Sequence, residues 1–315
     1  MKTRLVHAAL GASLLAGVSP AGAGETAFKP FLGIAEEFTD NVENIDKARR
    51  HDFITRVTPG FSGRYRSSLW DWNGSFMLDY RYYARNSRSE DTTSVVDLKG
   101  KVAVVENLLF LEVSDVYKRV SLDVARDFTQ ESLFRNQADT NVVTVSPYVL
   151  VRWKERTELR AGYRFEDIRY FSANVTVPEE TPVEVRNRTD HTVFAGISHA
   201  LTPRSSLTAD YSFRRELISS RDNVLHVALL GWEGKYGEKS GIKLQAGYGR
   251  LEFDGPREGG ASLTWNAELK HEAGPMKYLL SSGVNYIPDP LGGAARETRY
   301  RGEVVRATER NTVSV

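Results

Sequence analysis

Hydrophobic and polar residues alternate along most of this chain. Between Trp70 and Tyr82 the even positions are aromatic or apolar apart from one glycine, while most odd positions are polar or charged. The same two-residue period recurs at 159–166, 207–214 and 262–269. Because successive side chains of a strand point to opposite faces, each segment is predicted to form a ribbon with one apolar and one polar face.

Polar connections of alternating length join these segments. The short connections are 66–68, 106–107, 154–156, 203–205, 237–240, 273–275 and 309–311. The long connections between them are 84–92, 117–139, 170–190, 216–222, 254–260 and 287–297. One rim of tight turns and one rim of longer loops is typical of an up-and-down barrel that crosses the outer membrane.

The pattern predicts fourteen strands. They are 28–38, 53–65, 70–83, 94–105, 108–117, 140–153, 157–170, 190–201, 205–216, 223–236, 241–253, 261–271, 276–286 and 298–308. The strands of a soluble β-sandwich also alternate, but they are usually about 5–6 residues long, whereas a tilted span of the hydrocarbon layer needs about 9–11. The predicted fold is therefore all-β: a transmembrane, antiparallel, up-and-down outer-membrane β-barrel of about 14 strands.

Three segments fit this pattern less well. The segment 223–236 has apolar residues at both parities, 241–253 changes parity near Gly249, where we expect a bulge, and Pro147 lacks a ladder donor inside a strand. Thr312 to Val315 resembles the start of a fifteenth strand. Since single-chain bacterial barrels have an even strand number, the barrel either closes at fourteen with a short tail or belongs to a chain truncated from about sixteen. We favour truncation.

Aromatic residues gather near the ends of the predicted strands, as expected for rings at headgroup depth, although ordinary core aromatics are the alternative. They are Trp70, Trp72, Tyr80, Tyr82, Tyr83, Trp153, Tyr170 and Phe171.

The first 23 residues resemble a secretory signal peptide, with Lys2 and Arg4 ahead of a short apolar stretch and small residues before Ala23. We expect a signal peptide at 1–23 and a single barrel domain at 24–315, located in the cell outer membrane.

The chain has no cysteine, so neither a lipid anchor on cysteine nor a disulfide is expected. Without Lys2 and Arg4 there are 40 basic and 41 acidic residues, a balance that argues against a nucleic-acid partner. No apolar run after the signal is long enough for a transmembrane helix.

Two short motifs follow the signal. Glu37-Phe38-Thr39-Asp40-Asn41 is followed by Asp52-Phe53-Ile54 and then Pro59-Gly60. This order resembles the β-barrel porins associated with exopolysaccharide and PEP-CTERM (exosortase) loci, whose members are longer and have a complete final strand. The resemblance implies a location and an architecture, and a link to polysaccharide export, more than a reaction.

Candidate catalytic chemistry is sparse, so we predict that the chain is not an enzyme and has no catalytic, cofactor or metal site. No metal-binding or nucleophile motif is present, and His191 and His199 lie about 27 Å apart on one predicted strand. A Ser–His pair formed across strands stays open as an alternative, with His191, His199 and His226 as candidates.

The charged residues of the polar parity are the best functional candidates, because assigning the apolar parity to lipid places them in the lumen. They are Lys99, Lys101, Arg152, Arg160, Arg164, Glu166, Asp210, Arg214, Glu268, Lys270, Arg299, Arg301 and Glu303. Fourteen tilted strands give a backbone diameter of roughly 27 Å, and side chains leave an opening of roughly 10 Å. That opening suits ions or one extended sugar chain, unless the charges pair into a plug.

We therefore expect a porin-like channel linked to export of an exopolysaccharide or another envelope polymer. Its expected partners are outer-membrane lipid, the barrel assembly machinery and polysaccharide export components. The alternative is a non-conducting barrel that anchors or receives other envelope components through loops 117–139 and 170–190.

Overall fold

The computed structural model describes residues 24–40, 42, 50–87, 89–121, 137–174, 186–218, 221–254, 259–289, 293–307 and 312–314. The predicted signal peptide, 1–23, lies outside these residues.

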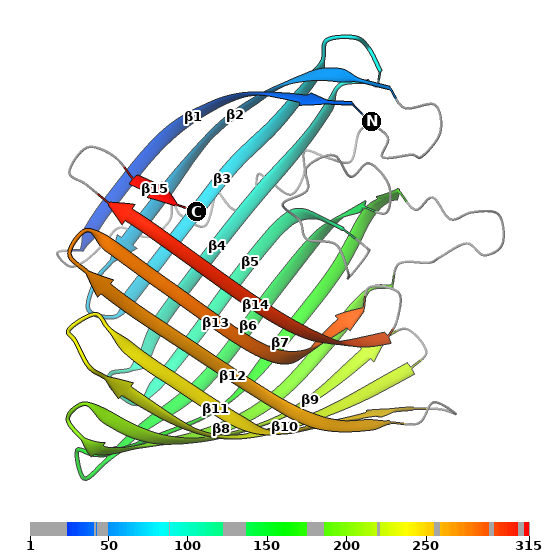
Figure 1. The fold of residues 1–315 in the computed structure, drawn as a ribbon. Coiled ribbons are helices and arrows are strands. Elements are labelled where there is room, and N and C mark those ends of the chain that lie inside the picture. The colour runs from blue at the N-terminus through cyan, green and yellow to red at the C-terminus, as the bar shows by residue number, and fades with distance from the viewer. Residues whose placement is uncertain are drawn as a thin grey trace.

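The described chain forms one curled antiparallel sheet in which every strand pairs with the next (Figure 1). Its strands are β1 (Glu25–Thr39), β2 (Asp52–Arg66), β3 (Trp70–Tyr83), β4 (Asp91–Val105), β5 (Leu109–Ser121), β6 (Gln137–Trp153), β7 (Thr157–Asn174), β8 (Arg188–Thr202), β9 (Ser205–Ile218), β10 (Arg221–Lys235), β11 (Gly241–Phe253), β12 (Gly260–Ala273), β13 (Met276–Asp289), β14 (Gly293–Ala307) and β15 (Thr312–Ser314). The fourteen long strands confirm the predicted all-β, up-and-down barrel. The hydrogen-bonded order runs from β1 to β15, and within the described residues no ladder joins β1 to β14 or β15.

The connections separate two rims. Tight turns join β2 to β3, β4 to β5, β6 to β7, β8 to β9, β10 to β11 and β12 to β13, and they line one end of the barrel, here called the turn rim (Figure 1). At the turn between β12 and β13, Gly274 has φ 58°, a conformation that glycine adopts without strain, and Pro275 follows it. The other ends of these strands form the opposite end of the barrel, here called the loop rim.

Two loop predictions are wrong. The segments 216–222 and 287–297 were expected to be long loops, but β9 continues to Ile218 before β10 begins at Arg221, and β13 continues to Asp289 before β14 begins at Gly293. Polar residues in these segments were interpreted as loop residues. They instead continue the strands: Glu216 is buried on the inner face beside Arg214, and Ile287 to Asp289 pair with β14.

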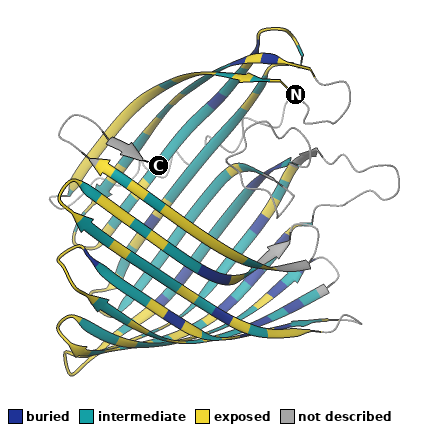
Figure 2. Ribbon diagram, viewed as in Figure 1, coloured by how far each residue is buried: buried dark blue, intermediate teal, exposed yellow. Residues whose placement is uncertain are grey.

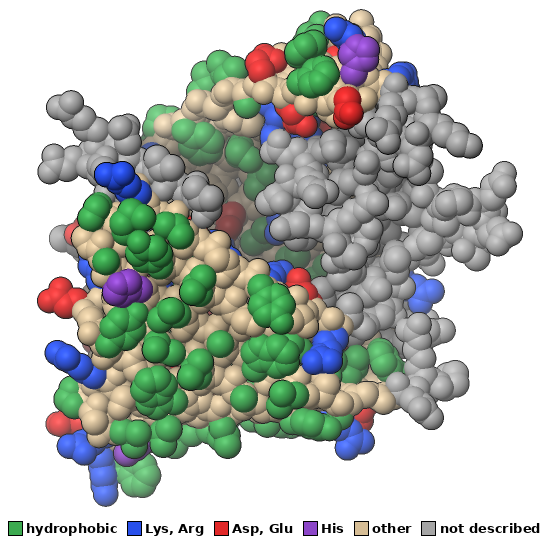
Figure 3. All heavy atoms as spheres, in the orientation of Figure 1, with side chains coloured by type: hydrophobic (Ala, Val, Ile, Leu, Met, Phe, Trp, Pro, Cys, Tyr) green, Lys and Arg blue, Asp and Glu red, His purple; other side chains and the backbone are tan. Residues whose placement is uncertain are grey.

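The outer face of the sheet is apolar. Exposed and less exposed residues alternate along β12, β13 and β14 (Figure 2), and hydrophobic side chains are scattered over the outer surface (Figure 3). Tyr300 is 75% exposed, Leu230 is 72% exposed and Ile34 is 69% exposed. An apolar face of this extent is unfavourable in water but fits hydrocarbon, so the sheet is a membrane-spanning barrel. None of the described residues belongs to a helix long and apolar enough to cross a bilayer.

The predicted aromatic girdles are correct only in part. Trp70, Trp153 and Phe171 are exposed on the outer face. Tyr83 instead is 1% exposed and packs with buried residues on the inner side, and Tyr170, which neighbours Phe171 along β7, has the opposite parity. Aromatic residue type alone therefore did not predict the face, whereas parity did.

The bulge predicted at Gly249 is absent. β10 and β11 pair in one unbroken register from Asn223 opposite Phe253 to Lys235 opposite Gly241. The apolar residues at inward-facing positions of these strands include Leu225 and Leu251, which lie opposite each other and are buried. The ladder between β4 and β5 does shift register near Ala103.

Pro147 is accommodated by a gap in one ladder. β6 pairs with β7 at Val145 opposite Phe165 and again at Tyr148 opposite Gly162, in the same register, and leaves Pro147 unpaired on that side. On the other side Pro147 lies opposite Leu111 of β5. A missing N–H therefore costs one ladder bond without changing which face each residue occupies.

The first sequence motif lies opposite Asp52-Phe53-Ile54 of the second at the loop rim. Thr39 faces Asp52 and Phe38 faces Phe53, whose rings are 5.1 Å apart. Asp52 is fully buried. Its carboxylate accepts hydrogen bonds from the backbone N–H groups of Phe53 at 2.8 Å and Ser87 at 3.1 Å, and from the hydroxyl of Ser87. The carboxylate thereby holds the start of the connection after β3 against β2.

Replacing Asp52 with alanine is expected to destabilise the barrel by about 1 to 3 kcal/mol, because buried donors lose a charged acceptor. Unfolding in urea measures this loss. The connection should also become sensitive to trypsin at Arg85, whose backbone N–H donates to Asp52 at 2.8 Å. Asp97→Ala is the control, because Asp97 pairs with an exposed Lys99 and should change stability little. Equal effects of the two substitutions would contradict the assigned role of Asp52.

Candidate functional site in the barrel interior

All thirteen charges predicted to line the lumen lie on one face of the sheet. Cross-strand register connects them: Lys101 lies opposite Glu112, Glu166 opposite Asp190, and Ser281 opposite both Glu268 and Arg301. This is the concave face, because Arg214 of β9 reaches the backbone carbonyl oxygen of Tyr286 of β13 at 3.5 Å, four strands further along the sheet. Whether these charges serve a passing solute stays a prediction.

Most of the predicted lumen cations are paired with carboxylates. Lys99 lies 2.8 Å from Asp97, Arg152 3.4 Å from Glu158, Lys270 2.7 Å from Glu268, Arg299 2.9 Å from Glu297 and Arg301 2.5 Å from Glu303. Asp210 accepts a hydrogen bond from Gln245 at 2.9 Å. These pairs are exposed to the interior, so each contributes little to stability, but together they keep this part of the wall nearly neutral.

A buried group of charges lies on the inner face of β7, β8 and β9 near the loop rim. Asp190 lies directly opposite both Glu166 and Glu216, so three carboxylates share one row. Arg188 Nε lies 2.8 Å from Asp190 Oδ1, and Arg214 Nε lies 3.6 Å from Glu216 Oε1. Asp190 and Glu216 are only 1% and 2% exposed. The arginines therefore offset the repulsion among carboxylates that are out of reach of water.

The β13–β14 hairpin leaves the wall near the loop rim and turns inward. The ladder between β12 and β13 ends at Asn266 opposite Gly283, although both strands continue, and their ends separate in Figure 1. Beyond this point the Tyr286 hydroxyl lies 2.5 Å from Ser262 Oγ and 3.4 Å from the carbonyl oxygen of Gly249. A Cβ at Gly249 would lie 2.6 Å from the Tyr286 ring, so glycine is needed for this close approach.

The strands of this region carry buried apolar residues. Val284 is fully buried, and Leu225 and Leu251 on the inner face of β10 and β11 are 3% and 5% exposed. The contacts of Tyr286 with Arg214, Ser262 and Gly249 place the hairpin across one side of the interior. The passage is therefore narrower there than a regular fourteen-stranded barrel would leave it.

Sequence reasoning missed the residues of both features. Arg188, Asp190 and Glu216 fell within or beside segments interpreted as loops, and Tyr286 was treated as the end of an ordinary strand. The polar parity of β8 and β9 extends through these positions, so continuing the alternation outward would have found the charges. Nothing local marks the inward turn of β13.

His191, His199, His226 and His271 lie on the outer face, away from these groups. The Nδ1 atoms of His191 and His226 lie 2.5 Å and 2.8 Å from the hydroxyls of Tyr163 and Tyr211, and Nδ1 of His199 lies 2.9 Å from Oγ1 of Thr157. In the part of the chain that the structure describes, no cluster of three or more histidine, aspartate or glutamate side chains is arranged to hold a metal ion. The predicted absence of enzymatic activity stays a prediction.

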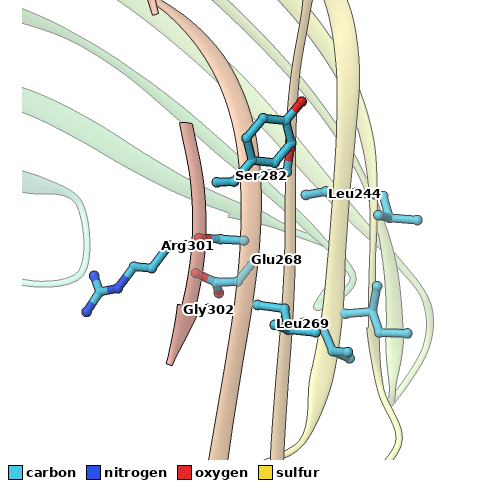
Figure 4. A pocket seen from close by; sticks show the side chains of 11 residues that line it. Leu244, Glu268, Leu269, Ser282, Arg301 and Gly302 are labelled. Carbon is cyan, nitrogen blue, oxygen red and sulfur yellow. The ribbon is translucent and has the colours of Figure 1, made fainter. Parts of the chain in front are cut away.

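A shallow groove over β11 to β14 belongs to the outer face. Leu244, Leu269, Leu280 and Tyr300 line it. Figure 4 shows Leu244 and Leu269 on one side of the sheet and the side chain of Arg301 extending away from them. The groove is therefore an uneven part of the apolar outer surface and not an opening into the lumen.

Comparison with known proteins gives remote structural likenesses only. No family model and no curated protein matches the chain. The copper transporter OprC matches with a TM-score of 0.43 and 9% identity over 91% of this chain, which spans 58% of OprC. OmpT of Vibrio cholerae, an outer membrane protein in trimer form, matches with a TM-score of 0.41 and 7% identity over 89% of this chain and 96% of its own. A Pseudomonas aeruginosa FadL homologue matches with a TM-score of 0.35 and 10% identity over 89% of this chain and 86% of its own.

Proposed function

We propose that this protein is an outer-membrane channel that carries a sugar polymer of the cell envelope, such as an exopolysaccharide, out of the cell. The observation that carries the proposal is the opposite character of the two faces of most long strands. The outer face is exposed and apolar, and the inner face holds charged side chains that a hydrated solute can contact. The predicted signal peptide and the two motifs that follow it support the location and the link to polysaccharide.

Single-channel recording tests the proposal. The mature chain, refolded in detergent, is added to a planar lipid bilayer, and stepwise increases in current are expected at low salt. Heat-modifiable migration on a gel shows independently that the barrel is folded. A folded and inserted barrel that passes no current would remove the channel proposal.

The second candidate is a non-conducting barrel that anchors or receives envelope components through its loops. The buried charges around Asp190 and the inward hairpin at Tyr286 favour it, because both reduce the open cross-section. Deletion of 122–136 and 175–185 separates the two functions. Loss of association with envelope components, with the current unchanged, would favour the receptor.

A further inference from the structure

In one part of the inner wall three cations lie over aromatic rings, and among the described residues only one of the three, Arg160, also has a carboxylate partner. Lys101 Nζ lies 4.6 Å from the centre of the Phe110 ring and 5.5 Å from that of Tyr148. The guanidinium carbon of Arg160 lies 4.1 Å from the Tyr148 ring centre. The guanidinium carbon of Arg164 lies 5.7 Å from the ring centre of Phe194. These six residues, from β4 to β8, are here called the cation–aromatic strip.

The rings form one row across neighbouring strands. Phe110 lies opposite Tyr148, and their rings stack with centres 5.3 Å apart. Tyr148 lies opposite Gly162, which lies opposite Phe194. A Cβ at Gly162 would lie 2.6 Å from the Cβ of Tyr148 and 2.7 Å from the Phe194 ring, so this glycine lets the row continue. Three strand-to-strand steps make the row roughly 14 Å long.

The charge of the strip is largely uncompensated. A ring face attracts a cation and restricts its position, but it carries no net charge and does not neutralise the cation. Within the described residues, no carboxylate oxygen lies within 4.0 Å of Lys101 or Arg164 in a salt bridge, and Arg160 has one partner, Glu112, at 3.6 Å. This arrangement contrasts with that of the inner-face cations that have a carboxylate partner, which are Lys99, Arg152, Lys270, Arg299 and Arg301.

The cations also face the interior. Lys101 is exposed, the Arg160 side chain is 42% exposed, and Arg160 Nε has no hydrogen-bond acceptor. Tyr148 is only 5% exposed, so its ring supports the cations and offers little surface to a solute. The acidic residues nearest along β7 on this face are Glu158, which pairs with Arg152, and Glu166, which lies opposite Asp190.

We infer that the cation–aromatic strip is a binding site for a sugar chain that carries carboxylates. The row of fixed positive charges matches a ligand with several linked anions better than one small ion, because each carboxylate meets a separate cation. The inference rests on the proposed function for the sugar chain, whereas the structure supplies the charge and its spacing. Ions in solution screen such attraction, so binding should weaken as salt rises.

The test measures binding of hexagalacturonate to the refolded barrel in detergent by calorimetry. The strip variant carries Lys101→Gln, Arg160→Gln and Arg164→Gln. The control variant carries Lys99→Gln, Arg299→Gln and Arg301→Gln, which removes the same number of lysines and arginines from the inner face where each has a carboxylate partner. We expect affinity to fall at least about tenfold in the strip variant and much less in the control. If the strip variant does not fold, the double variant Lys101→Gln with Arg164→Gln replaces it.

Two further ligands define the outcome. Neutral maltohexaose should not bind, and inorganic phosphate should bind far more weakly than hexagalacturonate. Equal hexagalacturonate binding by the strip variant and wild type, or binding of phosphate alone, would overturn the inference. Binding can be measured without a current, so the two proposals can fail separately. If the barrel passes no current but its binding of hexagalacturonate depends on the strip, only the channel proposal is rejected. If the barrel conducts but the strip variant binds hexagalacturonate as wild type does, only the binding-site inference is rejected.

Discussion

Replacing Tyr286 with alanine is expected to raise the conductance of the barrel. Tyr286 joins the inward end of the β13–β14 hairpin to Ser262 and to the carbonyl oxygen of Gly249. Truncating a fully buried aromatic side chain costs about 3 to 5 kcal/mol, so we expect the half-buried Tyr286 to contribute about 2 to 3 kcal/mol to the free energy that holds the hairpin inside. A loss of about 3 kcal/mol raises the population of the detached hairpin roughly a hundredfold. Single-channel recording measures the result as a larger or more frequently open current level.

Tyr300→Ala is the matched control, because Tyr300 lies on the same hairpin but is exposed on the outer face. It should leave the current unchanged. Tyr286→Phe keeps the ring and removes only the hydroxyl, so its effect should be intermediate. If Tyr286→Ala conducts as wild type does while the barrel remains folded, the hairpin is not the narrowest part of the passage.

Replacing Arg188 with methionine is expected to destabilise the barrel by about 3 to 5 kcal/mol. The substitution leaves Asp190, which is 1% exposed, without the arginine beside it and directly opposite Glu166 and Glu216. A buried carboxylate that loses its counter-charge keeps its desolvation cost and gains repulsion from its neighbours. The free energy of unfolding in urea measures the effect.

Two variants separate this explanation from a simple loss of packing. Arg188→Leu combined with Asp190→Leu removes the pair together and should recover most of the stability, because apolar residues can replace a buried pair at little cost. Arg301→Met removes an arginine that is 61% exposed and pairs with Glu303, so it should cost less than about 1 kcal/mol. Similar losses for Arg188→Met and Arg301→Met would show that burial of the Asp190 group contributes little.

The alternation of side chains predicted much of the fold because it is a local property. A strand shows opposite faces at successive positions wherever it lies, so parity alone separated exposed Leu230 and Tyr300 from inward Lys101 and Arg301. The same argument gave the number of long strands. It failed at 216–222 and 287–297, where polar residues were interpreted as loops, because polarity does not show that the backbone at these positions continues the ladder with the neighbouring strand.

The amino-acid sequence by itself determined the class of fold, the apolar outer face and the set of inward charges. Only the tertiary structure decided which of those charges are neutralised, since Arg301 pairs with Glu303 while Lys101 lies over the rings of Phe110 and Tyr148. It also decided that β13 turns inward to bring Tyr286 near Arg214. The physical reason is range: parity depends on neighbouring residues along one strand, whereas these contacts depend on how the sheet curls and brings distant strands together.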